Sequence, residues 1–119
     1  MLKKRIKSFK YAFDGIGHLI KSEPNVIIHF IAAVIAIGMG YFFSISLVEW
    51  CLIIFAIGFV FSAEAFNTAL EYLTDLVSPD YHELAGKAKD TAAAAVLIAA
   101  ITSALIGGII FLPRILTMF

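Results

Sequence analysis

The sequence predicts an all-α membrane protein, in which an amphipathic amino-terminal helix on the membrane surface precedes three transmembrane helices. Of its 119 residues, 61% are hydrophobic and only 15% are charged, and the mean hydropathy is +0.96. Soluble domains are about half apolar and about one quarter charged. A chain of this length has room for three spans of ~20 residues and one further segment. We therefore expect a single membrane domain over residues 1–119, without a separate soluble catalytic domain.

Residues 3–21 form the predicted surface helix. Apolar residues recur there at three- and four-residue steps among basic ones, which is typical of an amphipathic helix. A signal peptide would continue directly into an apolar core. Polar residues interrupt this stretch instead, namely Asp14, His18, Lys21 and Glu23. We expect the segment to be retained.

The first two spans are predicted at residues 26–43 and 48–73. Pro24 stands where a helix start tolerates proline, just before the first span. Only 14 uncharged residues separate Glu49 from Glu64, too few to cross a bilayer. The second helix must therefore carry Glu64, and a carboxylate is forced into or near the membrane.

The third span is predicted at residues 91–112, after a polar connection at residues 78–90 and before Pro113, which is expected to close it. Six of the nine Lys and Arg residues lie in residues 1–21, and Lys87 and Lys89 lie in the polar connection. The positive-inside rule therefore predicts a cytoplasmic amino terminus and connection, and an external carboxyl terminus.

Small residues four apart form two rows along the third span, which allows close helix packing in lipid. The rows are Ala95, Ala99, Ser103 and Gly107, and Ala100, Ala104 and Gly108. A single such row is equally explained by the abundance of alanine and glycine in membrane helices. Two parallel rows favour packing.

Four polar residues of the second span fall within one wedge about 80° wide on a helical projection. They are Glu64, Asn67, Glu71 and Asp75. A polar stripe can also hold helices together or lie among headgroups, and Asp75 alone is equally well explained in that way. For Glu64 we favour a functional role, because ionisable residues inside a span are costly and usually face a protein interior or a wet cavity.

Depth in the membrane gives these carboxylates distinct predicted roles. Counted from the outer turn near residue 46, Glu23 lies 23 residues back and Glu71 lies 25 residues forward, which places them within about 3 Å of the same height. Two carboxylates at one level suit Mg²⁺, which prefers oxygen ligands and keeps several positions for water and phosphates. Glu64 lies about 10 Å deeper, where it could act as general base on a lipid hydroxyl.

The remaining candidate motifs are weaker. The 78–90 connection has no phosphate-binding glycine loop, and His82-Glu83 does not extend to a zinc-protease motif because Gly86 replaces the second histidine. Lys87 and Lys89 are explained, without other information, by topology alone. His18 and His29 are isolated, and spacing assigns them no role. The single cysteine, Cys51, excludes an intrachain disulfide.

Two runs of residues resemble the signature of the small bacterial integral-membrane diacylglycerol kinases. They are Glu64-Ala-Phe-Asn67-Thr-Ala-Leu-Glu71, followed by Asp75, and Tyr81-His82-Glu83-Leu-Ala-Gly86-Lys-Ala-Lys89-Asp90. Glu23-x-Asn25 followed by His29, and the ending Phe111-Leu112-Pro113, are more similar to the undecaprenol kinase branch of this family. Ala85 departs from a serine common in the diacylglycerol branch, which weakens diacylglycerol as the substrate.

The resemblance implies a homotrimer in the bacterial inner membrane, with active sites between subunits at the cytoplasmic surface, ATP as phosphoryl donor and Mg²⁺ as metal. It assigns Glu23 and Glu71 to the metal, Glu64 to proton acceptance, and Asn67 to positioning of the reacting groups. The residues it assigns to nucleotide contact are Tyr11, Asp80, Tyr81, His82, Lys89 and Asp90. Lys4 or Arg5 would fill a further phosphate-contacting position.

These observations together predict a lipid kinase that phosphorylates a membrane alcohol, with undecaprenol as substrate and diacylglycerol as the alternative. Phosphoryl transfer asks the protein mainly for positioning and charge neutralisation, for which two metal-binding carboxylates, Lys89 and a base are sufficient. A proton-coupled transporter using Glu64 would need polar groups through the outer half of the bilayer, where the spans offer almost none. A noncatalytic assembly subunit would leave Glu23, Glu71 and the lysines unexplained. No nucleic-acid partner is expected.

Overall fold

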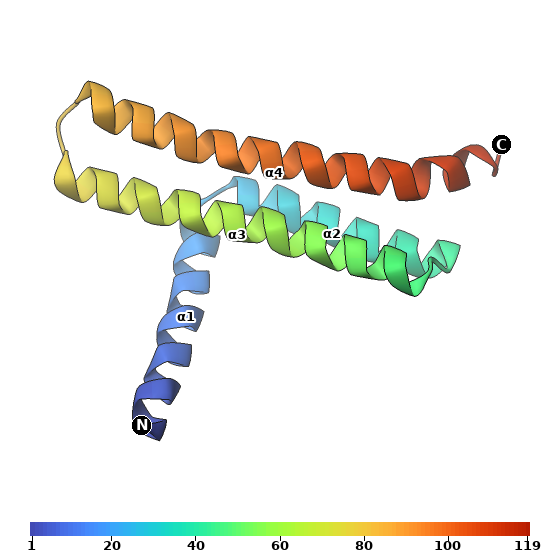
Figure 1. Ribbon diagram of the computed structural model, residues 1–119, viewed down its shortest axis with the longest axis horizontal. Coiled ribbons are helices and arrows are strands. Elements are labelled where there is room, and N and C mark those ends of the chain that lie inside the picture. The colour runs from blue at the N-terminus through green and yellow to red at the C-terminus, as the bar shows by residue number, and fades with distance from the viewer.

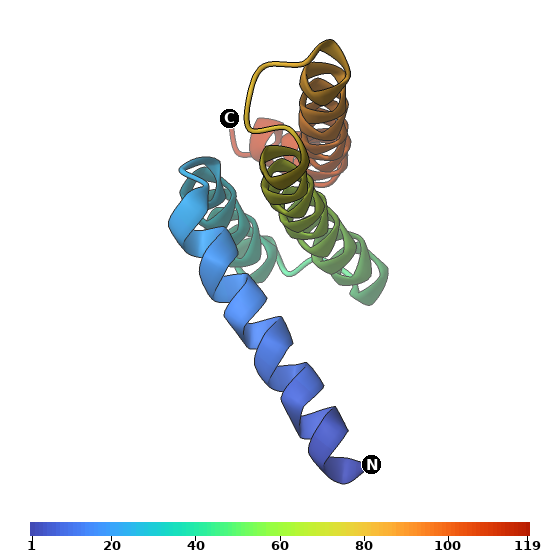
Figure 2. The same ribbon diagram turned by 90° about the vertical axis from the view of Figure 1, so that its left-hand side faces the viewer.

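The computed structural model describes all 119 residues and contains four α-helices joined by short connections. The helices are α1 (Leu2–Ser22), α2 (Asn25–Phe43), α3 (Leu47–Val77) and α4 (Glu83–Leu116). The three later helices run side by side, whereas α1 leaves the bundle at a steep angle (Figures 1 and 2). Each of α2, α3 and α4 is long and apolar enough to cross a membrane. The prediction of an all-α chain with three helices able to span a membrane is therefore confirmed.

Helix α3 is the centre of the fold and forms its most extensive contact with the antiparallel α4. Ala99 of α4 is completely buried in this contact, and the Ser103 hydroxyl donates a hydrogen bond to the Ala56 carbonyl oxygen of α3 (3.1 Å). The first row of small residues thus includes positions that pack against α3. With 31 and 34 residues, α3 and α4 extend about 46 Å and 51 Å, well beyond the ~30 Å hydrocarbon core.

Helix α4 extends beyond the predicted third span at both ends. Helix α4 begins at Glu83 rather than near Thr91, so most of the expected polar connection is helical. Its start is capped by the His82 ring, whose Nδ1 accepts a hydrogen bond from the Leu84 N–H (3.1 Å). Alanine, lysine and glutamate are good helix formers, so the charges of this stretch do not interrupt the helix. The helix also continues through Pro113 to Leu116, as membrane helices tolerate proline.

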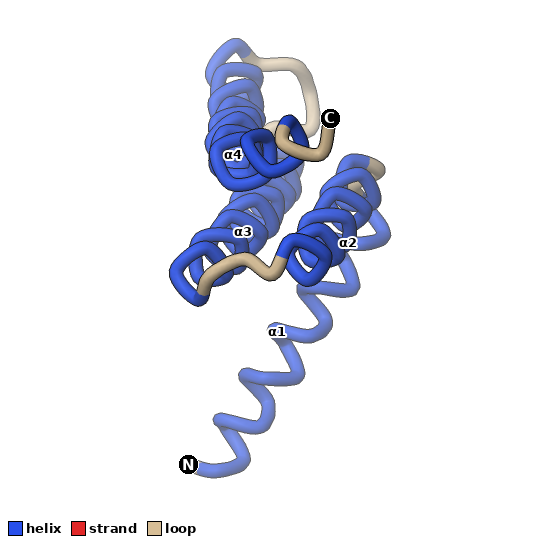
Figure 3. The backbone as a smooth tube through the Cα atoms, turned by 90° about the vertical axis from the view of Figure 1, so that its right-hand side faces the viewer, coloured by secondary structure: helices blue, strands red, loops and turns tan.

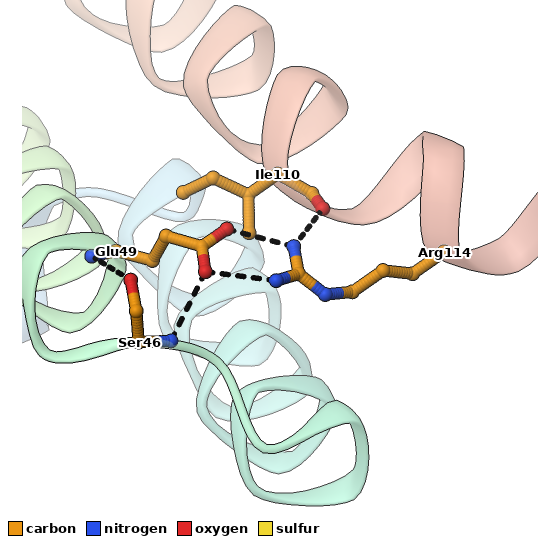
Figure 4. A network of polar contacts seen from close by, with 4 residues as sticks. All are labelled: Ser46, Glu49, Ile110 and Arg114. Carbon is orange, nitrogen blue, oxygen red and sulfur yellow. Dashed lines mark hydrogen bonds and ion pairs between the residues drawn. The ribbon is translucent and has the colours of Figure 1, made fainter.

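The end of the bundle opposite the 78–82 connection is held together by a tight turn and an ion pair. Ser46 caps α3: its hydroxyl accepts from the Glu49 N–H, and the Glu49 carboxylate accepts from the Ser46 N–H. The Arg114 guanidinium of α4 donates to both oxygens of that carboxylate (2.7 and 2.8 Å) and to the Ile110 carbonyl oxygen (Figure 4). The turn joins the adjacent ends of α2 and α3 (Figure 3), so this contact ties α4 to both.

Candidate active site

The most deeply buried polar residues of the chain lie on one face of α3. Glu64, Asn67 and Thr68 are 1%, 6% and 5% exposed, and Glu71 follows one turn later as a half-buried residue. Burial of an ionisable side chain at a membrane helix is costly and marks a candidate functional site. The helical spacing of these residues explains why they share a face.

Glu23 joins this group from the corner between α1 and α2. Its backbone ends α1, and Pro24 begins the turn into α2. Burial, followed by the neighbouring carboxylates of Glu71 and Glu64, raises the pKa of Glu23. Both effects disfavour its ionised form. The fold therefore brings Glu23 close enough to Glu71 and Glu64 for their charges to interact. Glu23 and Glu71 are the pair for which the sequence predicts equal depth.

Only some of the polar groups in this cluster have hydrogen-bond partners within the chain. The His29 ring nitrogen Nε2 lies 3.0 Å from Oε1 of Glu64, and the Asn67 amide donates to Oε1 of Glu71 (3.4 Å). The Asn67 carbonyl oxygen Oδ1 and the Thr68 hydroxyl are buried without a partner. A buried polar group without a partner costs about 1–3 kcal/mol. These two groups are therefore available to a ligand or to a further protein surface.

Lys89 reaches the acidic face of α3 from α4. Its ammonium group donates a hydrogen bond to the carboxylate of Asp75, which lies one turn beyond Glu71. Lys87 instead pairs with Glu83 on its own helix (3.3 Å). The structure thus distinguishes two lysines that topology alone left equivalent, and only Lys89, to which the family resemblance gives a role, is directed towards the acidic face.

The other residues assigned to the nucleotide are exposed but are not all in one place. Asp80, Tyr81, His82 and Asp90 lie at the exposed α3–α4 end of the bundle. Tyr11 is exposed on α1, which makes no contact with α4. Figure 1 shows α1 pointing away from the bundle. A single chain therefore does not bring Tyr11 and the α4 residues together.

Sequence reasoning missed two side chains of this site, His29 and Thr68. The sequence does contain a signal for His29. His29 lies 17 residues before residue 46, and Glu64 lies 18 residues after residue 46. The depth argument that pairs Glu23 with Glu71 therefore also pairs His29 with Glu64. Thr68 follows Asn67 and shares the buried face, but a threonine in an apolar span gives no distinctive signal.

The match to a known family defines the class of this protein. Residues 10–111 match the family described as prokaryotic diacylglycerol kinase, a range that contains every carboxylate of the acidic cluster. With three apolar helices and this acidic cluster, the chain is therefore a membrane-embedded lipid kinase of bacterial type. The chain is a member of the prokaryotic diacylglycerol kinase family. The transporter and assembly-subunit interpretations are set aside on this finding.

Curated relatives cover almost the whole chain. It is 40% identical over 114 residues to the undecaprenol kinase of Bacillus subtilis, across 96% of this chain and 93% of that protein. It is 37% identical over 112 residues to a diacylglycerol kinase of Synechocystis, across 93% of this chain and 64% of that protein. A diacylglycerol kinase of Haemophilus influenzae is 34% identical over 107 residues, across 89% and 91% of the two chains.

Proposed function

We propose that this lipid kinase transfers the γ-phosphoryl group of ATP to undecaprenol, at a site built around Glu64, Glu23 and Glu71. The observation that carries the proposal is the acidic cluster, in which the buried Glu64 lies near the half-buried Glu23 and Glu71. The 40% identity to an undecaprenol kinase over nearly the full length of both chains supports the choice of substrate.

In the proposed reaction, Glu64 is the proton acceptor. Its carboxylate takes the proton of the lipid hydroxyl while that oxygen attacks the γ-phosphorus of ATP. The bond between the γ-phosphorus and the β–γ bridging oxygen breaks, and ADP leaves with the electron pair. The products are the lipid monophosphate, ADP and a protonated Glu64, which later releases its proton to water. Asn67, whose Oδ1 has no protein partner, would position the reacting groups.

Glu23 and Glu71 are the residues that would hold Mg²⁺. No set of three or more His, Cys, Asp or Glu side chains in the chain has the arrangement of a metal site, so a cage made only of protein is absent. Mg²⁺ beside a nucleotide needs only one or two carboxylates, because phosphates and water complete its shell. The crowding of negative charge around Glu23 fits such an ion. When bound, Mg²⁺ supplies neutralisation of the phosphate charge.

The lipid tail would lie in an apolar groove beside Glu64. This groove has a volume of about 680 Å³ and is formed by α1, α2 and α3, with Leu19, Val26, Phe30 and Ala65 among its lining residues. Ala65 directly follows Glu64 in the chain. A lipid tail in the groove would therefore lie along α3 at the level of the proposed base.

We further propose that the active unit is a homotrimer with sites between subunits. Only 15 of the 119 residues are buried in a single chain, and the shallower carboxylates Glu23, Glu71 and Asp75 stay partly or fully exposed. Polar groups at membrane depth must be enclosed by protein or line a wet cavity. Tyr11 and the α4 residues Lys89 and Asp90 would meet at one nucleotide if they came from different copies. The nucleotide would also contact Asp80, Tyr81 and His82.

The proposed topology places the amino terminus, α1 and the active site at the cytoplasmic face, with α1 on the membrane surface. Cysteine replacing Met118, in a chain carrying Cys51→Ala, should react with an impermeant maleimide in intact cells. Cysteine replacing Ser78 should react only after lysis, because the basic residues near it remain inside. Reaction of the residue 118 probe only after lysis would contradict the three-span topology.

Phosphorylation of purified lipids tests the proposed function. The protein in detergent, given Mg²⁺ and ATP labelled at the γ-phosphate, should label undecaprenol with a kcat/KM at least ~10-fold above that for diacylglycerol. Addition of EDTA should stop the reaction, and excess Mg²⁺ should restore it. The diacylglycerol kinases among the relatives make diacylglycerol the second candidate, which faster labelling of that lipid would establish. Labelling of no lipid would overturn the proposal.

A further inference from the structure

His29 is in hydrogen-bond contact with the deepest carboxylate of the site. Its Nε2 lies 3.0 Å from Oε1 of Glu64, although the two residues are 35 positions apart in the chain. The Glu64 side chain is 1% exposed and that of His29 is 19% exposed. A hydrogen bond to a charged group in a poorly hydrated place is stronger than one at the surface. This contact therefore fixes the position of the Glu64 carboxyl group.

We propose that His29 is a positioning residue for the reaction, which orients Glu64 by donating its Nε2–H to Oε1. The proposal rests on the role given to Glu64 above. With Oε1 engaged by the ring, Oε2 is the oxygen left to accept the proton of the lipid hydroxyl. The bond to Oε1 persists after that transfer, because the carbonyl oxygen of the protonated acid still accepts it. In this role His29 exchanges no proton with the substrate.

The surroundings of His29 agree with a role in orientation. Small residues of α4 face it across a cavity of about 250 Å³ that also extends along α2 and α3, including Ala100, Ser103 and Ala104. The Ser103 hydroxyl is already committed to the Ala56 carbonyl oxygen. Glu64 is thus the partner that holds the ring in place. Displacement of a reacting group by about 1 Å can lower a rate by ~100-fold.

Substitutions at His29 separate this role from simple space filling. His29→Leu removes the donor, and we expect kcat to fall at least ~10-fold while KM for MgATP stays within about twofold. His29→Gln places an amide donor near the position of Nε2 and should recover most of the lost kcat. His29→Asn carries the same donor on a shorter side chain and should resemble His29→Leu. This comparison remains decisive even where the leucine variant does not fold.

A double-mutant cycle tests whether His29 acts through Glu64. In a Glu64→Gln background, His29→Leu should lower the residual kcat by less than about twofold, since no base is left to orient. The inference is overturned by an equal loss in both backgrounds, by full activity of His29→Leu, or by a His29→Gln variant no better than His29→Asn. Absence of lipid phosphorylation by the wild-type protein would instead overturn the proposed function, so the two failures are distinguishable.

Discussion

Glu64→Gln should lower kcat by at least ~100-fold while the affinity for MgATP changes far less. Glutamine keeps the shape and the hydrogen-bonding capacity of the side chain but cannot accept the proton of the lipid alcohol. The Glu64 carboxyl group is more buried in the protein than that of Glu71 and lies about two turns nearer the middle of α3. Steady-state phosphorylation of lipid, with nucleotide binding measured separately, provides both quantities.

Glu49→Gln is the matched control for that variant. It makes the same chemical change on the same helix, at the end of α3 where Glu49 contacts Ser46 and Arg114. Assayed at a temperature where it stays folded, it should retain a kcat within about twofold of wild type. A Glu64→Gln variant that lost MgATP affinity as strongly as kcat would make Glu64 a ligand of the metal–nucleotide complex, and the base would have to be found elsewhere.

Glu71→Gln should abolish activity and weaken MgATP binding, while the oligomeric state of the protein in detergent stays unchanged. Glu71 and Glu23 are the proposed metal ligands, and a neutral amide is a much poorer ligand for Mg²⁺ than a carboxylate. Titration of MgATP into the Glu64→Gln and Glu71→Gln variants separates the two roles, since only the second should bind weakly. Size-exclusion chromatography reports whether the assembly survives.

A small effect of Glu71→Gln would count against the metal assignment. Activity within about tenfold of wild type corresponds to a barrier change of only ~1.4 kcal/mol. Loss of one of two carboxylate ligands from a bound Mg²⁺ should cost far more than that. Such a result would leave the acidic cluster without an explanation in metal binding, whatever the outcome for Glu64.

The sequence predicted the helices that depend on hydropathy, and failed where helix ends depend on local chemistry. The short uncharged stretch between Glu49 and Glu64 required a long second span, and α3 is a single helix of 31 residues. The start of α4 was missed because charge between residues 83 and 90 suggested a loop, whereas the alanines and lysines there favour a helix. Pro113 was expected to end the third span because proline breaks helices in water. Membrane helices tolerate proline, and α4 continues through it.

The site was predictable to the extent that depth and helical face determine it. Counting residues from one turn gives the shared level of Glu23 and Glu71, and helical spacing gives the buried face around Glu64. Side-chain pairing was not predictable in this way. Whether Lys89 or Lys87 forms the ion pair with Asp75 depends on the rotation of α3 and α4 about their axes. The proposed contact of Tyr11 with the nucleotide would need a neighbouring copy of the chain, whose position the sequence does not describe.

The position of Glu23 at the junction of α1 and α2 connects the orientation of α1 to the chemistry of the site. Glu23 directly follows the last residue of α1 and precedes Pro24, which begins the turn into α2, so a tilt of α1 moves its carboxyl group. If binding of MgATP is stronger in one orientation of α1, then bound nucleotide favours that orientation by the same factor, as thermodynamic reciprocity requires. Anionic lipids that attract the lysines of α1 would then change the affinity for nucleotide without contacting the acidic cluster.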